Sequence, residues 1–325
     1  MSNLKVDVVI PVYNGARFLE DAVRSAANQT LSPARILICD DGSTDDTPRL
    51  AQRLAAEIGN VEHLRLRHGG EASARNGGIE ASTAPYIAFL DADDVWLPRK
   101  LEAQMAVLAN SNEKVGIVHS SYEYIDENGK VISSESVVKP RLRGDIFRQL
   151  LLDDYVVSGS ASSVVVKREV LDRAGRFDER LFHGADWDMW IRLAALAHFD
   201  FADEPLVRIR IHSNSVQRYN ARERAIDFFL QRILVLGKWE DIILSDSEFY
   251  SSLRKRALLL LLPMLAEPKR IDAFYKALQD QDSTLARSLF RGRRDLWCAI
   301  FYALAKYGTW RLRRHLWNDR RPFLE

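Results

Sequence analysis

The sequence contains little cysteine and no long apolar run. Cys39 and Cys298 are its only cysteines, and they stand far apart among apolar residues. This placement favours free thiols in a cytosolic protein over a disulfide framework. The longest apolar stretches, residues 257–266 and 297–305, are well below the ~20 residues that span a bilayer. Because the N-terminus also lacks the apolar core of a signal peptide, we expect neither a secreted nor an integral membrane protein.

The chain as a whole also has no large excess of positive or negative charge. The 46 Lys and Arg residues and the 45 Asp and Glu residues nearly cancel, to a net charge of +1. This balance argues against a nucleic-acid-binding protein. The distribution is uneven, because residues 287–321 hold ten Lys or Arg and two Asp, and the rest of the chain is acidic. With 47% hydrophobic residues, the 325 residues suffice for one large folded domain or two ordinary ones.

Strand and helix patterns alternate through the first third of the chain. Runs rich in β-branched residues predict buried strands, and segments with apolar residues at helical spacing follow them. We expect strands at residues 6–12, 35–39, 61–66 and 86–90, and helices at residues 18–26, 47–58, 73–81 and 98–108. This alternation predicts a parallel sheet whose ligand crevice lies at the carboxyl ends of the strands. No Gly-x-Gly-x-x-Gly loop is present, which disfavours a dinucleotide-dependent dehydrogenase.

The alternation becomes looser in the middle of the chain and ends near Tyr219. The elements expected there are strands at residues 115–119, 162–166 and 207–211, a hairpin at residues 126–129 and a helix at residues 186–195. From Ala221 onward the periodicity is mainly helical. We therefore expect an α/β domain over residues 1–219 and a helical region over residues 220–325.

Acidic clusters follow two of the expected strands, and a third cluster opens a later helix. The clusters are Asp40-Asp41, Asp91-Ala92-Asp93-Asp94 and Asp186-Trp187-Asp188. Carboxylates that meet in one crevice repel one another unless a cation lies among them. Oxygen ligands suit Mg²⁺ or Mn²⁺, whose coordination is usually completed by substrate phosphates. The alternative interpretation is that these acids only form turns and cap helices.

Seven short segments of this chain resemble one enzyme family. Four of them resemble the nucleotide-binding half of the family-2 glycosyltransferases, namely Val9-Ile10-Pro11-Val12-Tyr13-Asn14, Asp40-Asp41-Gly42-Ser43-Thr44-Asp45, Ala74-Arg75-Asn76-Gly77-Gly78 and Asp91-Ala92-Asp93-Asp94. Three more resemble the acceptor half, namely Gly175-Arg176-Phe177-Asp178-Glu179, Asp186-Trp187-Asp188 and Arg210-Ile211-His212. The resemblance implies a GT-A fold, with a mainly parallel central sheet flanked by helices. It assigns residues 1–114 to the nucleotide half and residues 115–219 to the acceptor half.

The same resemblance implies a nucleotide site at the first four segments. Its residues are Pro11, Val12, Tyr13, Asp41, Arg75, Asp91 and Ala92. Asp41 would accept a hydrogen bond from the ring N–H of the base. An unpaired polar group left by the wrong base costs about 1–3 kcal/mol, so this contact suits base selection. His68 and His183 have no carboxylate or histidine at metal-like spacing, and the sequence gives them no role.

The Asp91-Ala92-Asp93 segment matches the family's Asp-x-Asp metal motif. The resemblance makes Asp93 the main ligand of Mn²⁺ or Mg²⁺, with Asp91 facing the metal or the ribose. Asp94 is expected to cap the helix that follows Pro98. His212 is a further metal-ligand candidate at the end of the last strand, with a plain surface histidine as the alternative.

A general base is needed to take the proton from the attacking acceptor hydroxyl. The resemblance assigns this role to Asp186, with Asp188 as the rival. Residues two apart on a helix do not face the same way, so only one of the two can reach the acceptor. The residue before Asp186 is Ala185, where the family usually has Glu. Trp187 and Trp190 either stack on a sugar or belong to the core.

The resemblance implies an inverting, metal-dependent transfer of one sugar from a nucleotide sugar, with UDP as the expected nucleotide. The acceptor would be a hydroxyl of a glycan or lipid-linked molecule in cell-surface polysaccharide synthesis. The chain lacks the Gln-x-x-Arg-Trp motif of processive members. Two alternatives remain open, a sugar-1-phosphate nucleotidyltransferase and a non-catalytic protein that binds nucleotide sugars or scaffolds at a membrane.

The basic tail over residues 287–321 has its own set of interpretations. Its Arg and Trp residues flank the apolar run 297–305, a pattern typical of segments that lie on an anionic membrane surface. Packing on the catalytic domain or contact between two copies of the chain would explain it equally. We expect a cytoplasmic protein that contacts no nucleic acid, with the membrane interpretation placing it at the inner face of the cell membrane.

Overall fold

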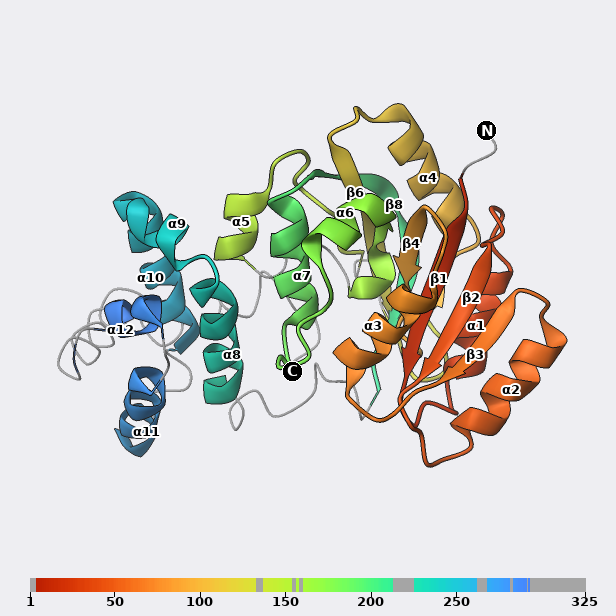
Figure 1. Cartoon of the computed structure of the whole chain (residues 1–325), viewed down its shortest axis with the longest axis horizontal. Helices are drawn as coiled ribbons and strands as arrows, with labels where there is room; N and C mark the ends of the chain where they lie inside the picture. Colours follow the sequence, from red (N-terminus) through yellow and green to blue (C-terminus); the bar gives the residue numbers. More distant parts are fainter. Residues whose placement is uncertain are drawn as a thin grey trace. The chain divides into compact units, whose positions relative to one another are not determined.

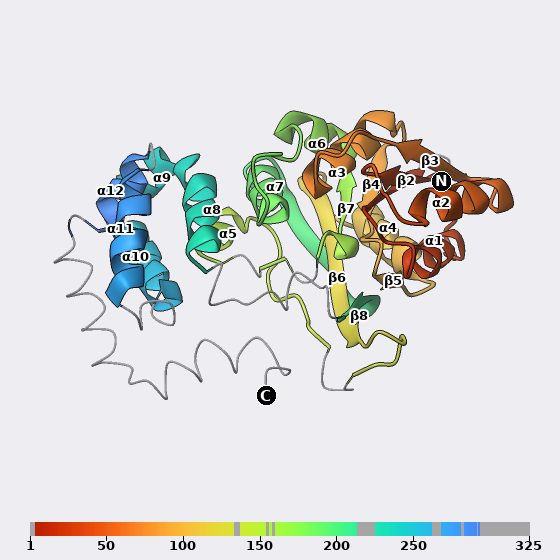
Figure 2. The same cartoon turned by 90° about the horizontal axis from the view of Figure 1, so that it is seen from below.

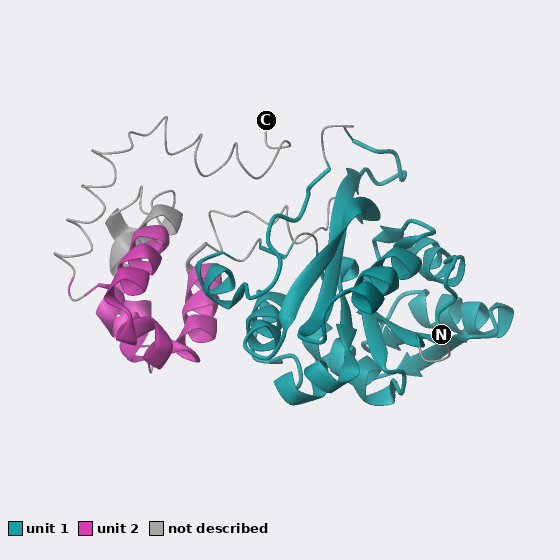
Figure 3. Ribbon diagram, turned by 90° about the horizontal axis from the view of Figure 1, so that it is seen from above, with its two compact units in different colours: residues 1–215 teal, residues 216–325 magenta. Residues whose placement is uncertain are grey.

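The computed structural model describes residues 4–132, 137–153, 156–157, 160–212, 225–261, 268–280, 283–290 and 292. The chain divides into two compact units, residues 1–215 and residues 216–325 (Figure 3). The boundary predicted near Tyr219 falls outside the described residues and stays a prediction.

Four parallel strands form the first half of the sheet in unit 1 (Figure 1). They are β1 (Val6–Val12), β2 (Arg35–Asp40), β3 (Val61–Arg65) and β4 (Tyr86–Phe89). The strand β1 pairs with β2 on one side and with β4 on the other, both in parallel. All seven residues of β1 are buried, as its β-branched sequence requires of a strand covered on both faces. The predicted parallel sheet is confirmed.

Three helices connect these strands and cover the sheet. They are α1 (Leu19–Ala27), α2 (Thr47–Glu57) and α3 (Glu71–Ala81). Because crossovers between parallel strands are right-handed, α1 and α2 lie on one face and α3 on the other (Figure 1). Gly78 lets α3 approach closely, since a Cβ there would lie 2.4 Å from Val9 Cγ1 and 2.7 Å from Cys39 Sγ.

The second half of the sheet mixes parallel and antiparallel strands. It contains β5 (Val95–Trp96), β6 (Val115–Ile125), β7 (Val165–Lys167) and β8 (His198–Arg210), and the full order is β3-β2-β1-β4-β7-β6-β8-β5. The long strands β6 and β8 pair in parallel, whereas β7 runs antiparallel to both β4 and β6 (Figure 2). The strand expected at residues 162–166 is divided between a 3₁₀ turn, η1 (Ala161–Ser163), and β7.

The remaining helices of unit 1 are α4 (Lys100–Asn110), α5 (Phe147–Leu152), α6 (Arg168–Ala174) and α7 (Ala185–Ala194). The described part of unit 2 is helical, as expected, with α8 (Ala225–Gly237), α9 (Glu240–Ser245), α10 (Ser247–Leu261), α11 (Pro268–Gln279) and α12 (Thr284–Leu289). Phe274 packs edge-on against Phe229 and Phe290 in its core. None of the helices in the described ranges is long and apolar enough to cross a bilayer. Most of the basic tail lies outside those ranges.

The buried His119 on β6 makes the stability of unit 1 sensitive to acid. Its ring is fully buried against Phe199 and Phe201, and this burial lowers its pKa to about 3. In the unfolded chain the imidazole of His119 takes up a proton near pH 6.5, whereas in the folded chain it stays neutral until about pH 3. The free energy of unfolding therefore falls as the pH drops from 6.5 toward 3. We expect His119→Leu to remove about 2–3 kcal/mol of the stability difference between pH 7 and pH 4.5, measured by urea unfolding. An unchanged difference would contradict this role.

Candidate functional site

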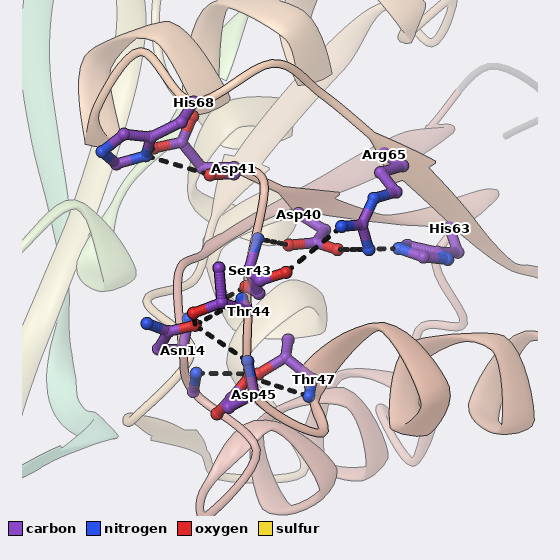
Figure 4. Close-up of polar contacts among 11 residues, drawn as sticks. Asn14, Asp40, Asp41, Ser43, Thr44, Asp45, Thr47, His63, Arg65 and His68 are labelled. Atoms are coloured by element: carbon purple, nitrogen blue, oxygen red, sulfur yellow. Dashed lines mark hydrogen bonds and ion pairs between the residues drawn. The ribbon is translucent and has the colours of Figure 1, made fainter.

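A network of polar contacts fixes the loops that follow β1 and β2 (Figure 4). Asn14 has a left-handed backbone, with φ of 51°, and its Oδ1 accepts hydrogen bonds from the N–H groups of Thr44 at 2.8 Å and Asp45 at 3.3 Å. The Asn14 N–H donates to Ser43 Oγ at 2.9 Å. The two loops therefore form one unit at the carboxyl edge of the sheet.

Asp40 belongs to this framework and not to an open binding surface. Its carboxylate is fully buried and accepts the Ser43 N–H at 2.8 Å. Its other oxygen lies 3.4 Å from His63 Nε2 and 3.3 Å from Arg65 NH1, both on β3 (Figure 4). Of the first acidic cluster, Asp40 thus serves the fold, whereas Asp41, which is also buried at 2% exposure, contacts the loop that follows β3.

Asp41 lies in a cluster with Tyr13 and His68. Its two carboxylate oxygens accept the backbone N–H groups of Gly69 at 2.8 Å and Gly70 at 2.9 Å. His68 Nδ1 lies 2.8 Å from Asp41 Oδ2 (Figure 4). The rings of Tyr13 and His68 are stacked, with centroids 4.4 Å apart and planes at 28°. Tyr13 is therefore close to Asp41, as the nucleotide prediction requires.

Pro11 and Val12 differ from Tyr13 because both are buried in β1. Their side chains belong to the sheet, and the carbonyl of Val12 accepts the Asp41 N–H at 2.8 Å. They hold the loop that presents Tyr13. Their predicted part in nucleotide binding stays a prediction and would act through this support.

Arg75 on α3 is the centre of a second cluster. It is 4% exposed, and its NH2 donates to Asp91 Oδ1 at 2.8 Å and to Glu71 Oε1 at 2.5 Å. The guanidinium also lies over the Phe177 ring, 5.4 Å from the centroid. Arg75 belongs to the predicted nucleotide half and Phe177 to the predicted acceptor half, so the segments assigned to the two halves are in contact here. Against the effect of burial, the negative charges of Glu71, Asp91 and Asp186 raise the pKa of Arg75.

Glu71 is a residue of this cluster that the sequence analysis missed. The Glu71 side chain is 61% exposed at the rim of the cluster. The Arg75 guanidinium lowers its pKa, whereas partial desolvation beside Arg75 and the charges of Asp91, Asp186 and Asp93 raise it, to about 6. The available signal was its position four residues before Arg75, the spacing of an ion pair on a helix.

Of the three predicted metal ligands, the structure brings Asp93 and His212 together and leaves Asp91 paired with Arg75. Asp93 Oδ2 lies 2.9 Å from His212 Nε2, and the Asp93 side chain is 37% exposed. Asp91 points to Arg75 instead, and Ala92 lies between them, partly exposed. The carboxylate oxygen suits Mn²⁺ or Mg²⁺, whereas the imidazole nitrogen suits Mn²⁺ better than Mg²⁺, and diphosphate oxygens and water would complete the coordination. In the described ranges, no group of three or more acidic, His or Cys side chains forms a complete metal site.

Asp94 does not cap the helix after Pro98, contrary to expectation. It is 3% exposed, and its carboxylate accepts hydrogen bonds from Ser160 Oγ at 3.1 Å, Ser162 Oγ at 2.6 Å and the Arg210 N–H at 3.0 Å. Burial, followed by the charges of Asp93 and Asp91, raises its pKa well above the usual range. The helix α4 begins only at Lys100. Asp94 was mistaken for a cap because its partners come from distant parts of the sequence.

Ser162 and Arg210 complete the support of the Asp-x-Asp loop. Ser162 Oγ accepts the Asp91 N–H at 2.9 Å while donating to Asp94. Arg210 Nε donates to the Asp93 carbonyl at 2.9 Å, and its NH2 pairs with Asp21 at 3.0 Å. The turn η1 and the end of β8 therefore position the backbone of both Asp91 and Asp93.

The two acids of α7 have different surroundings. Asp188 is fully buried and pairs with Arg192 at 2.8 Å. Asp186, the second residue of the helix, is partly exposed, and its Oδ1 accepts the Trp187 N–H at 2.8 Å. Of the two candidates, only Asp186 is accessible to an acceptor. Trp187 and Trp190 are 3% and 2% exposed and belong to the core.

Comparison with solved structures defines the class of fold. S. aureus TarS 1–349 in complex with UDP-GlcNAc superimposes with a TM-score of 0.64 at 16% identity, over 94% of this chain and 93% of that one. The mannosyltransferase PcManGT from Pyrobaculum calidifontis, in complex with GDP-Man and Mn²⁺, gives a TM-score of 0.54 at 19% identity, over 97% and 88%. The mixed sheet flanked by helices is thus that of the GT-A glycosyltransferases, as predicted.

Sequence comparison identifies the family. Residues 7–175 match Glycosyl transferase family 2, and the chain belongs to that family. It is 31% identical over 249 residues to an uncharacterized glycosyltransferase of Rickettsia prowazekii, covering 74% of this chain and 76% of the relative. It is 29% identical over 197 residues to the Escherichia coli UDP-Glc:alpha-D-GlcNAc-diphosphoundecaprenol beta-1,3-glucosyltransferase WfgD, over 59% and 71%. A related Rickettsia conorii glycosyltransferase is much longer, and the match covers 34% of its length.

Proposed function

We propose that this glycosyltransferase moves a single sugar from a UDP-sugar to a hydroxyl of a glycan or lipid-linked acceptor, with inversion at the anomeric carbon and with Mn²⁺ or Mg²⁺. The observation that carries the proposal is the contact between Asp93 and His212 beside the Arg75–Asp91 pair. Asp93 and His212 could hold a metal ion next to a cationic group at the carboxyl edge of the sheet, where nucleotides bind in open α/β folds.

Base recognition would use Tyr13 and Asp41. The Tyr13 ring is 49% exposed and offers a face for stacking, and the Asp41 carboxylate can accept a ring N–H. Uracil carries such an N–H. The names of WfgD and of the TarS complex, which mention UDP-Glc and UDP-GlcNAc, support UDP, while the GDP-Man complex of PcManGT keeps guanine as an alternative.

Asp186 would act as the general base. Its carboxylate takes the proton of the acceptor hydroxyl, the oxygen attacks the anomeric carbon opposite the diphosphate, and the bond between that carbon and the phosphate oxygen breaks. A metal ion held by Asp93 and His212 would neutralise the charge that develops on the departing diphosphate. Arg75 adds a fixed positive charge beside Asp91.

A lipid-linked acceptor is supported by the diphosphoundecaprenol in the name of WfgD. The membrane interpretation of residues 287–321 would fit such an acceptor, but most of this tail lies outside the described residues. Among the alternatives, membership of the glycosyltransferase family argues against a nucleotidyltransferase. The partly exposed acid Asp186, whose charge acts on Arg75, argues against a protein without catalytic activity.

Calorimetric titration with UDP, GDP, CDP and TDP, each with and without Mn²⁺, tests the donor site. We expect UDP to bind in a Mn²⁺-dependent manner and more tightly than CDP, because cytosine has no ring N–H for Asp41. Preference for GDP would move the assignment to a GDP-sugar. Absence of binding by all four nucleotides would contradict the proposed function.

A further inference from the structure

The Asp41 cluster contains a feature that the proposed function does not require. A base bound as proposed must stack on Tyr13 and donate a ring N–H to Asp41. In the structure, the imidazole of His68 already stacks on Tyr13 and contacts the Asp41 carboxylate (Figure 4). The following inference rests on the proposed function, since it concerns the same base site.

His68 imitates a base in its hydrogen bonding as well as in its stacking. Its Nδ1 lies 2.8 Å from Asp41 Oδ2 and 3.0 Å from the Asp41 carbonyl oxygen. Both neighbours are acceptors, so Nδ1 must carry the proton and donate. The Asp41 carboxylate also receives the backbone N–H groups of Gly69 and Gly70, which keep it in place whatever the His68 side chain does.

A base cannot enter between the two rings while they are in this position. A ring inserted between them would need centroids about 7 Å apart, twice the ~3.5 Å contact distance of stacked carbon atoms. The observed separation of the Tyr13 and His68 centroids is 4.4 Å. A base that uses the Tyr13 face covered by His68 and the Asp41 oxygen paired with His68 must therefore take the volume that the imidazole fills.

We propose that His68 is a built-in competitor for the base site. It closes the site when no nucleotide is bound, and the side chain must rotate away before a base can bind. The His68 side chain is 59% exposed, so it can rotate into solvent. Only the fraction of molecules in which His68 has rotated away can bind a nucleotide. The presence of His68 therefore lowers the apparent affinity for every nucleotide by the same factor.

His68→Ala tests this inference by the titrations described above. We expect the variant to bind UDP about tenfold more tightly than the unmodified protein, which corresponds to about 1.4 kcal/mol. CDP should gain by the same factor, leaving the ratio of the two affinities unchanged. His198→Ala is the matched control, because His198 lies at the opposite end of β8 from Arg210 and outside the cluster, and its UDP affinity should not change.

Each remaining result has a distinct meaning. Weaker UDP binding in His68→Ala, or a changed ratio of UDP to CDP affinity, would show that the imidazole contacts the bound base and would overturn the inference. Unchanged affinity would overturn it as well, while leaving the proposed function intact. If neither the unmodified protein nor the variant binds any nucleotide, the proposed function fails and the inference fails with it. Binding by the variant alone would support both.

Discussion

Asp186→Asn should lower the rate of sugar transfer by at least about 100-fold, because an amide of the same size cannot take the acceptor proton. UDP affinity in the presence of Mn²⁺ should stay close to that of the unmodified protein, since Asp186 lies on α7, in the predicted acceptor half. The rate is measured as UDP release from UDP-glucose and UDP-GlcNAc in the presence of a bacterial glycolipid extract.

Asp172→Asn is the control for this experiment. Asp172 is a half-exposed acid on α6 that pairs with Arg168 and Arg176 and has no part in the proposed mechanism. Its replacement should leave transfer unchanged. Transfer at the normal rate by Asp186→Asn would mean that another group takes the proton, with Glu71 as the first candidate because its charge interacts with that of Asp186.

Asp93→Ala should remove the increase in UDP affinity that Mn²⁺ produces. The variant deletes one of the two proposed protein ligands and leaves His212 without its carboxylate partner at 2.9 Å. Loss of a metal ligand should weaken Mn²⁺-dependent binding of UDP by at least about tenfold, since even outer-shell partners contribute that much. Binding of UDP without Mn²⁺ should change little. Titration of the variant with UDP at several Mn²⁺ concentrations measures both quantities.

Two further variants define the meaning of that result. Asp46→Ala removes an acid that is 74% exposed at the start of α2, and it should keep the full effect of Mn²⁺. His212→Ala should weaken Mn²⁺-dependent binding in the same direction as Asp93→Ala, and the double variant should lose little more than either single one. A normal Mn²⁺ effect in Asp93→Ala would exclude Asp93 as a metal ligand.

The elements that sequence reasoning predicted well are those whose pattern is local. The β-branched run of β1 predicts a strand buried on both faces. In α1, one buried face is predicted by the helical spacing of Leu19, Ala22, Val23 and Ala26. The strand β8 was predicted only at its end, over residues 207–211. Its earlier part contains Asp203, Glu204 and Pro205, which look like a loop, yet β6 pairs with it along its length apart from local register shifts.

The parts of the site that escaped prediction depend on partners far away in the sequence. The sequence around Asp94 predicts a helix cap, because its actual partners, Ser162 and the backbone of Arg210, are distant in the sequence and meet it only in the fold. His68 gained no role because its partners, Tyr13 and Asp41, follow two other strands. The Asp-x-Asp and Asp186 segments could be recognised because each lies within a few adjacent residues, but the roles predicted for them await the experiments above.

The buried ion pair of α7 has a consequence for the entropy of catalysis. Arg192 joins Asp188 to the carbonyl oxygens of Ala174 and Arg176, so the helix is held at the position just after Asp186. Ordering one residue of a loose backbone costs about 1–2 kcal/mol, and a base on a mobile loop would incur that loss in every catalytic cycle. The backbone of Asp186, the proposed base, becomes ordered once, when the chain folds, and acceptor binding would have only a short side chain left to orient.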